Sequence, residues 1–557
     1  MSARVLVIGL DGATLDLIQP WVDQGHLPNL ARLMTQGKYG KLRSVYPVLS
    51  PSAWASFSTG VNPGKHGLID FVVRDEHSYQ LNLINRTHVK MPSLWRLLSE
   101  YGKRVGVINV PLTYPPEPVN GVLVTGLGTP ADKTFTYPAE LSQTLRAEGY
   151  RVDKEIFYHP AHEDQYLTAV YDTVRSQLNH VQKLLVEDDW DFFMYVFRDT
   201  DELAHFFWQH MDKTHPQYNQ ASFEKHGTAL LDYYSFVDHQ VGTLIDQAGE
   251  AATVFIVSDH GFGPLYKDVF LNEWLAQTGF LTKKRTATRQ RLFSQLGITR
   301  SGIADRLRRL GLYNIEKLIK QALGDRVQAL PKDARPEFAS GIDWSRTKAY
   351  SFGYHGQIFL NVKGREPNGI ILEEDYEMVR EEIITALQAL TDPEDGLPVV
   401  DQVFTREEVF SGDCLPMMPD LVVVMRDFAY ITRNGYELGD TQGSIFCPPF
   451  THESGSHRLD GILFAQGPTI SSVGQNLIET ANLVDVMPTI LYLLDCPIPT
   501  YVDGEHLSIL SDEWLNQHEV TYTDDVLPSS ISDEKMSWDA EDERMIKEQL
   551  KKLGYLD

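Results

Sequence analysis

One short stretch, residues 253–263, constrains the fold more than any other part of the chain. It begins with five apolar or β-branched residues and reaches glycine at position 261, a pattern that is typical of a short strand buried on both faces. Asp259 and His260 follow this strand directly. A buried carboxylate is costly unless a cation or strong hydrogen-bond donors accompany it. Adjacent Asp and His side chains at a strand end are suitable ligands for a divalent metal ion.

The same pattern occurs twice more. Residues 5–10 are almost entirely apolar and run into Asp11, and residues 192–197 are followed closely by Asp201 and then His205. Ligands of open parallel sheets bind outside the carboxyl ends of the strands, so we expect the three acids to converge at one edge. Any one of these aspartates alone is better explained as a cap or turn residue. The three together, two of them near a histidine, favour a metal site.

Composition limits the classes of protein that the chain can belong to. Its 557 residues suggest two to four structural units. A hydrophobic content of 42% and a charged content of 23% are ordinary for a globular protein. The formal net charge of −26 argues against general nucleic-acid binding.

The cysteines and the N-terminus bear on the compartment. Cys414, Cys447 and Cys496 are too few and too dispersed for a disulfide framework or a cysteine-rich zinc site. No apolar run approaches the ~20 residues of a membrane span. The run at 5–10 is shorter than the about 7–15 apolar residues of a signal peptide. These features predict a cytoplasmic protein with no transmembrane segment and with reduced thiols.

Helical and strand-like patterns alternate along most of the chain, which predicts an α/β fold with a mostly parallel central sheet flanked by helices. We expect a discontinuous core at 1–272 and 340–510, a basic helical insert or cap at 273–339, and an acidic C-terminal tail at 511–557. Between positions 283 and 335 there are fourteen Lys or Arg residues against four Asp or Glu residues. A solvated face is the default interpretation of this charge. The alternative is a basic lid over an anionic substrate, or a surface for acidic partners or for peripheral contact with lipids.

Three further positions carry candidate functional side chains. Ser50 precedes a proline, as an N-cap residue often does, and a hydroxyl at a helix N-terminus lies where a phosphate is held. Lys65 and His66 lie in a turn-rich loop, where an exposed lysine and a packed histidine are the default; Lys65 is kept as a candidate for substrate binding. His457 lies in a small polar segment with few apolar neighbours, which suits a ligand better than a core histidine.

The candidate groups together indicate a centre with two metal ions. They are Asp11, Ser50, Asp201, His205, Asp259, His260 and His457. Carboxylates, imidazoles and a hydroxyl suit Zn²⁺, Mn²⁺ or Fe²⁺, and three histidines disfavour an all-oxygen Ca²⁺ or Mg²⁺ cage. The set is too large for one tetrahedral ion but fits two ions ~4 Å apart. In such a site a metal-activated Ser50 attacks phosphorus, a phosphoseryl enzyme forms, and water hydrolyses it.

In its motifs and their order, the chain resembles the alkaline phosphatase superfamily, and specifically its type I phosphodiesterase/nucleotide pyrophosphatase branch. The matching segments are 7–12, 27–30, 50–60, 66–70, 201–205, 258–261, 455–457 and 485–491. The resemblance implies an alkaline-phosphatase-like α/β sandwich with an inserted cap and two metal subsites, with Zn²⁺ the preferred ion.

The resemblance also implies how the site residues divide. Asp201, His205 and His457 would hold one ion. Asp11, Asp259 and His260 would hold the other, and Ser50 would be the nucleophile.

Two positions depart from the family pattern. Family phosphodiesterases usually carry a threonine nucleophile and an asparagine that binds a phosphate oxygen, where this chain has Ser50 and Phe71. The absence of the asparagine leaves phosphate binding to backbone N–H groups, to Lys65 or to the basic insert. A sulfatase is excluded because residues 50–54 lack the Cys/Ser-x-Pro-x-Arg motif.

The leading hypothesis is a two-metal phosphodiesterase or pyrophosphatase that acts on a small-molecule phosphate ester. The first alternative is another phosphoryl-transfer enzyme with the same site: a monoesterase, a phosphonate hydrolase, a mutase or a transferase. The second is a non-catalytic relative that binds an anion through the basic insert. The full set of candidate ligands argues against the second alternative, because drift would be expected to remove some of them.

Overall fold

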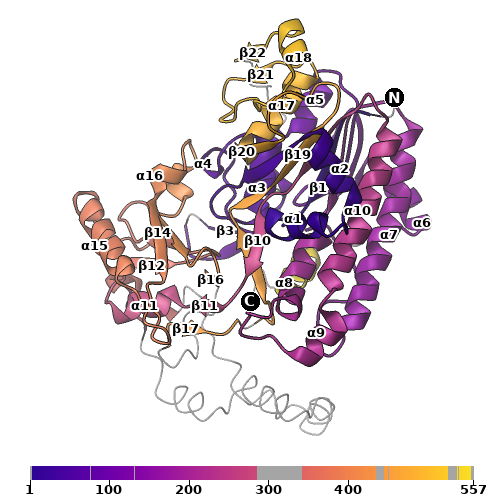
Figure 1. Cartoon of the computed structure of the whole chain (residues 1–557). Coiled ribbons are helices and arrows are strands. Elements are labelled where there is room, and N and C mark those ends of the chain that lie inside the picture. Colours follow the sequence, from indigo (N-terminus) through magenta and orange to yellow (C-terminus); the bar gives the residue numbers. More distant parts are fainter. Residues whose placement is uncertain are drawn as a thin grey trace.

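The chain forms two lobes, a larger one on a nine-stranded sheet and a smaller one on a four-stranded sheet (Figure 1). The computed structural model describes residues 3–75, 77–130, 132–284, 341–433, 444–449, 451–524, 536 and 538–553. In Figure 1 the small lobe carries α15 (Tyr376–Gln388) and lies to the left of the large sheet.

The large sheet is mostly parallel, as expected. Its strands in spatial order are β20 (Leu477–Asn482), β2 (Lys38–Arg43), β19 (Asp460–Gln466), β9 (Thr253–Val257), β1 (Ala3–Leu10), β8 (Trp190–Phe197), β5 (Val105–Val110), β6 (Gly121–Thr125) and β7 (Thr136–Tyr137). The central strands β9, β1, β8, β5 and β6 run parallel to one another, while β19 runs antiparallel to its neighbours β9 and β2. Every residue of β5 and β9 is buried, which explains their unbroken apolar sequences.

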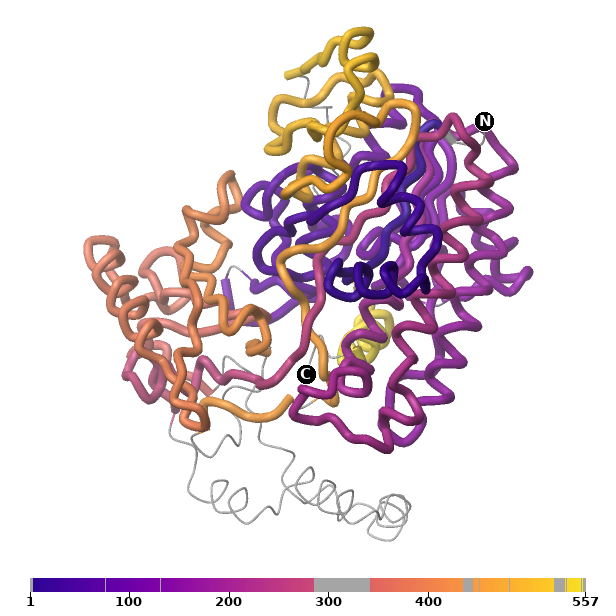
Figure 2. The backbone as a smooth tube through the Cα atoms, viewed as in Figure 1, coloured from indigo at the N-terminus to yellow at the C-terminus, as the bar shows by residue number. Residues whose placement is uncertain are grey.

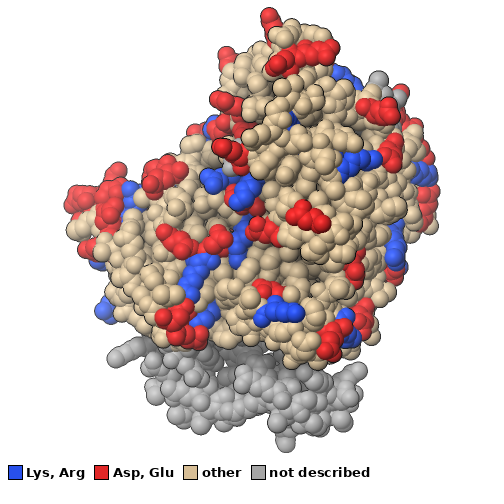
Figure 3. All heavy atoms as spheres, in the orientation of Figure 1, with Lys and Arg blue, Asp and Glu red and all other residues tan. Residues whose placement is uncertain are grey.

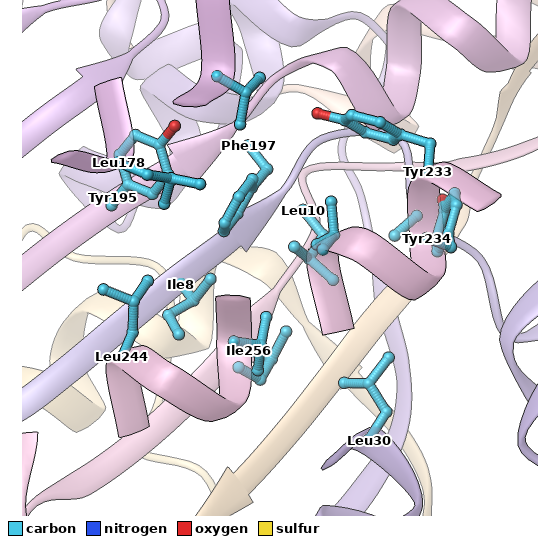
Figure 4. Packing of buried hydrophobic residues seen from close by; sticks show 14 of the residues in the cluster. Ile8, Leu10, Leu30, Leu178, Tyr195, Phe197, Tyr233, Tyr234, Leu244 and Ile256 are labelled. Atoms are coloured by element: carbon cyan, nitrogen blue, oxygen red, sulfur yellow. The ribbon is translucent and has the colours of Figure 1, made fainter. Parts of the chain in front are cut away.

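Helices cover both faces of this sheet. One face packs against α1 (Leu15–Asp23), α2 (Pro28–Gln36), α7 (Glu163–Glu187) and α10 (Ala229–Ala248), and the other against α3 (Ser50–Thr59), α5 (Leu94–Glu100) and α17 (Val486–Leu493). Side chains of β1 alternate between the two cores: Ile8 and Leu10 enter the first, whereas Val7 enters the second. Figure 4 shows Ile8 and Leu10 in the first core, together with Tyr233 of α10.

The small lobe is a feature that the sequence analysis did not anticipate. Its strands, in the order β12 (Ala349–Ser351), β13 (Gln357–Leu360), β15 (Leu421–Met425) and β14 (Val400–Thr405), pair antiparallel with one another and form a separate sheet. This part was expected to continue the core from residue 340. Its hydrophobic core also takes in α11 (Leu271–Gln277), α15, and Leu68 and Phe71 from the large lobe, so the two lobes share apolar packing.

The C-terminal region, expected as an acidic tail, contains packed structure. It includes α18 (Asp512–Gln517) and α19 (Ala540–Lys552). Ile546 and Leu550 of α19 are buried in the core of the small lobe, while Gln549 hydrogen-bonds Asp153 of the large lobe. This helix therefore lies between the lobes, near the C-terminal label in Figure 2. Its apolar residues recur at helical spacing within an acidic sequence.

Residues 285–340, which include most of the expected basic insert at 273–339, lie outside the described residues. The two positions that flank this segment are neighbours, because the backbone N–H of Lys284 donates to the carbonyl of Gly341 at 2.8 Å.

Figure 3 shows that acidic side chains gather over α15 on the surface of the small lobe. Among the described helices, none is both long and apolar enough to cross a membrane.

Candidate functional site

Three buried carboxylates meet at the carboxyl edge of the large sheet. The in-register pairing of β1 with β8, in which Leu10 lies opposite Phe197, brings the ends of these strands together. Asp11 follows β1, and Asp259 lies two residues beyond β9. Asp201 lies in the first turn of α8 (Asp199–Met211), which begins just after β8. All three side chains are buried, and their convergence matches the prediction from the strand ends.

Buried cations hold the first turn of α8 in place. Lys154, whose side chain is 1% exposed, pairs with Asp199 at 2.7 Å and with Glu202 at 2.5 Å. Arg198 pairs with Glu202 at 3.1 Å. The acids on either side of Asp201 therefore have cations of their own, while Asp201 faces the other site carboxylates and histidines.

Three histidines lie beside the carboxylates. His205 is one helical turn after Asp201 on α8, and His260 follows Asp259. His457 lies on β18 (Gly455–Arg458), which pairs with β10 (Gly261–Pro264), so its ring stacks on that of His260 with centroids 3.7 Å apart. His457 therefore comes from a short strand and not from the polar loop that its sequence suggested. The small residues of β10 and β18 allow this close pairing.

Each of these histidines directs Nδ1 to a backbone carbonyl. The contacts are His205 to Gly455 at 3.0 Å, His260 to Gly261 at 3.1 Å and His457 to Val48 at 2.8 Å. A carbonyl oxygen only accepts hydrogen bonds, so Nδ1 carries the proton and Nε2 carries the lone pair. This is the arrangement that metal-ligating histidines commonly have.

The ligand atoms form two overlapping groups, each within 4.8 Å. One group is Asp201, His260 and His457, and the other is Asp11, Asp259 and His260. His205 adjoins the first group, with its Nε2 3.1 Å from Nε2 of His457 and 3.5 Å from Oδ2 of Asp201. The structure thus brings together all six proposed ligands. The resemblance assigns His260 to one metal subsite only, whereas the structure places His260 in both groups.

The electrostatics of the cluster fit bound cations. Burial, and then the charges of Asp259 and Asp201, raise the pKa of Asp11 well above its ordinary value. Burial, and then Asp201, raise the pKa of Asp259 to about 7. Within the described part of the chain, Oδ1 of Asp11 and Oδ2 of Asp259 are buried without a hydrogen-bond partner. Divalent cations would remove this unfavourable charge, and carboxylate and imidazole donors suit Zn²⁺, Mn²⁺ or Fe²⁺.

Helix α3 brings a hydroxyl and an indole to the cluster. Ser50 is the first residue of this helix and Leu49 its N-cap, so the expected capping role is displaced by one residue. The buried Ser50 Oγ lies 3.4 Å from Nε2 of His260. One turn later, Nε1 of Trp54 donates to Oδ2 of Asp11 at 3.0 Å. Trp54 was not found from the sequence, because an apolar residue in a helix gives no sign of a polar contact.

The structure does not bring Lys65 to the cluster. It lies on α4 (Pro63–His66), beyond the C-terminal end of the ten-residue α3, whereas Ser50 is at the N-terminal end. Nζ of Lys65 donates to the carbonyl of Tyr501 at 2.7 Å and pairs with Asp503.

Two neighbours of Lys65 are packed side chains. His66 is fully buried and contacts Ser56 at 2.9 Å, as the default interpretation has it. Phe71, at the position where the family usually has asparagine, is 1% exposed and packs in the core of the small lobe. Neither side chain binds phosphate from this position.

A fourth histidine near the cluster was missed in the sequence. His355 comes from the small lobe, is 3% exposed, and has its ring centroid 5.5 Å from that of His457. Burial, and then the nearby His457 and His260, hold its pKa well below the ordinary value. Its sequence neighbours, Tyr354 and Gly356, carry no ligand pattern that would have marked it.

The fold defined by this sheet and its helices is alkaline-phosphatase-like. A similar solved structure is the phosphonoacetate hydrolase from Sinorhizobium meliloti 1021 in complex with phosphonoformate, with a TM-score of 0.53 and 14% sequence identity over 88% of this chain and 95% of that chain. At this identity the likeness concerns the fold alone. A search of curated proteins found no match.

The chain belongs to the type I phosphodiesterase / nucleotide pyrophosphatase family, whose sequence profile matches residues 5–444. The matched region contains Ser50 and the site residues from Asp11 to His260. It ends before His457, whose place in the site therefore depends on the geometry described above.

Proposed function

We propose that the protein is a two-metal hydrolase of small-molecule phosphate esters, of the phosphodiesterase/pyrophosphatase type, with Ser50 as the nucleophile. The observation that carries this proposal is the position of Ser50 Oγ, 3.4 Å from Nε2 of His260, inside a buried cluster of three carboxylates and three histidines. Membership of the phosphodiesterase/pyrophosphatase family supports the reaction class.

We assign the ligands as the resemblance implies. Asp11, Asp259 and His260 hold one ion, and the other is held by Asp201, His205 and His457. Zn²⁺ is the preferred ion for this donor set, with Mn²⁺ or Fe²⁺ as alternatives. When bound, the cations supply Lewis-acid chemistry that favours the deprotonated forms of a hydroxyl and a water molecule and offsets charge on phosphoryl oxygens.

Ser50 carries the covalent chemistry. Its Oγ loses a proton and attacks phosphorus, the P–O bond to the leaving alcohol breaks, and that alcohol takes up a proton. Water then attacks the phosphoserine, the bond between phosphorus and Oγ breaks, and Ser50 regains its proton. The position of Ser50 at the start of α3 places the phosphoryl group beside N–H groups of the first helical turn, which favour an anion.

Phe71 gives a reason to keep monoester hydrolysis as a second candidate. Its buried ring supplies no donor to the phosphate, so the usual phosphodiesterase contact is missing at this position. The rates on a chromogenic phosphodiester and on the matching monoester, measured with reconstituted metal, distinguish the two candidates.

The central test is Ser50→Ala. The variant should lose turnover by about 10⁴-fold or more, because the covalent step needs this oxygen, while its metal content stays normal. Ser58→Ala is the matched control: Ser58 lies at the other end of α3 and donates to the carbonyl of Ala55, so its rate should not change. Near-wild-type turnover in Ser50→Ala would disprove the nucleophile assignment and direct attention to Ser52 or to direct attack by water.

A further inference from the structure

The small lobe contributes one side chain, His355, to the edge of the cluster. It lies in the turn between β12 and β13. Its ring centroid is 5.5 Å from that of His457 and 5.5 Å from that of Phe428, and the side chain is 97% buried. The nine-stranded sheet therefore does not build the whole site, because part of the wall beside His457 belongs to the other lobe.

The turn holds His355 in an unfavourable backbone conformation. The φ angle of His355 is +58°, in the left-handed region that is unfavourable for a residue with a Cβ. Thr432 fixes the turn from both sides: its Oγ1 accepts from the N–H of Gly356 at 2.9 Å and donates to the carbonyl of Gly353 at 2.9 Å. The fold thus maintains a strained position in order to place this ring.

Nδ1 of His355 is fully buried and has no hydrogen-bond partner within the described part of the chain. A buried polar atom without a partner destabilises the folded protein. The ligand histidines differ in this respect, because each binds a backbone carbonyl through Nδ1. His355 belongs to neither of the two compact ligand groups. These facts point to a hydrogen-bond partner that arrives with a ligand.

Arg458, the residue after His457, is bound to other groups, because it donates to the carbonyls of Pro264 and His457 at 2.6 and 2.9 Å. Lys65 is not part of the cluster and pairs with Asp503. Carboxylates and metal-facing imidazoles offer a phosphoryl group no hydrogen-bond donor of their own. A neutral imidazole offers one N–H donor.

We infer that His355 is a substrate-binding residue that donates a hydrogen bond to a non-bridging oxygen of the phosphoryl group. The inference rests on the proposed function, because that function places a phosphoryl group between Ser50 and the ligand cluster. It assigns the small lobe a direct part in recognising the anion.

The test uses the full-length, metal-loaded protein with inorganic phosphate as the probe. His355→Ala should bind phosphate about 10- to 100-fold more weakly in a calorimetric titration. Its kcat/KM on a chromogenic phosphate ester should fall by a similar factor, with metal content and melting temperature unchanged. His355→Asn keeps an amide donor and tolerates positive φ, so it should recover part of the affinity and carries the test if the alanine variant does not fold.

His452→Ala is the control, because His452 also has a positive φ, of +61°, but is not part of the cluster. Equal phosphate binding by wild type and both His355 variants would overturn the inference. So would loss of bound metal from these variants, which would make His355 a residue that positions a ligand. Wild-type protein that binds phosphate through His355 but hydrolyses no ester would refute the proposed function alone. Wild-type protein that binds no phosphate would refute both.

Discussion

Single residues around the site differ in how their orientation is fixed. The three histidines proposed as ligands are oriented by backbone carbonyls, which no substitution of a side chain removes. Asp11 is oriented by a side chain, because Oδ2 accepts from the indole of Trp54 while Oδ1 faces the cluster. An indole donor that fixes one oxygen leaves the other to a metal ion, so Trp54 should affect metal binding without being a ligand.

We therefore predict that Trp54→Phe weakens metal binding by about 10- to 100-fold. The substitution keeps an aromatic ring against Phe57, 5.5 Å away in the wild type, and removes only the N–H donor and part of the ring. A competition titration against a chromogenic chelator measures the change. Trp95→Phe is the matched control, because Trp95 also donates from its indole to a buried carboxylate, that of Glu117, in α5 away from the site. Equal metal affinity in the two variants would contradict the positioning role.

The residues that the sequence could reveal are those whose chemistry conflicts with their local pattern. Asp11, Asp259 and His260 are polar side chains directly after buried strands, and parallel pairing necessarily gathers them. Trp54 and His355 follow no such rule, because their roles depend on tertiary contacts and, for His355, on a positive φ. Lys65 shows the reverse problem: its place in a loop suggested access to substrate, but its side chain is bound to Tyr501 and Asp503.

At the level of elements, the positions of strands could be predicted better than the sheet that each strand joins. The strands β1 and β8 are eight residues long, and with β9 they form apolar runs that mark a buried parallel sheet. The small lobe is built from strands of three to six residues. Runs this short do not show from the sequence which sheet they join, because pairing partners are chosen by tertiary packing. The helices α3 and α4 form a further unit, joined by the buried contact between Ser56 and His66.

The burial of His66 predicts that the stability of the protein depends on pH. Burial lowers the pKa of His66 from 6.5 to about 3, so the unfolded chain binds a proton near pH 6.5 that the folded chain refuses. The contribution of His66 is complete above pH 6.5 and is lost as the pH falls toward 3, at about 1.4 kcal/mol per pH unit. Between pH 6.5 and 5, the unfolding free energy of the wild type should therefore fall by about 2 kcal/mol more than that of His66→Gln.

Urea unfolding of the metal-free proteins at several pH values measures this difference, and the absence of metal removes its own pH dependence from the comparison. Parallel stability profiles for wild type and His66→Gln would mean that His66 already takes up a proton in the folded protein.

For the whole molecule, the main question is which parts of the chain the two lobes need. The core of the small lobe takes in apolar residues of the large lobe, and α19 packs between the lobes, so we expect them to unfold together. The segment 285–340 is different, because the chain enters and leaves it at adjacent positions: Lys283 and Ile342 form an antiparallel bridge, and Lys284 donates to Gly341. A short linker can therefore close the gap without moving either lobe.

We predict that replacing residues 285–340 by a short Gly-Ser linker leaves the melting temperature within a few degrees of the wild type, because the linker joins two adjacent positions, Lys284 and Gly341, and keeps every packed residue of the described lobes. All of the described site residues lie outside this segment. The kcat/KM for an ester with a small, uncharged leaving group should therefore change by less than about threefold, whereas Ser50→Ala in the same background should abolish turnover.

Thermal unfolding and initial rates on a series of esters with neutral and anionic leaving groups provide the measurement. An increase in KM confined to anionic esters would show that basic residues between 285 and 335, twelve of the fourteen counted above, recognise substrate charge. A loss of activity on every ester would show that the segment completes the site itself, in contradiction of the prediction.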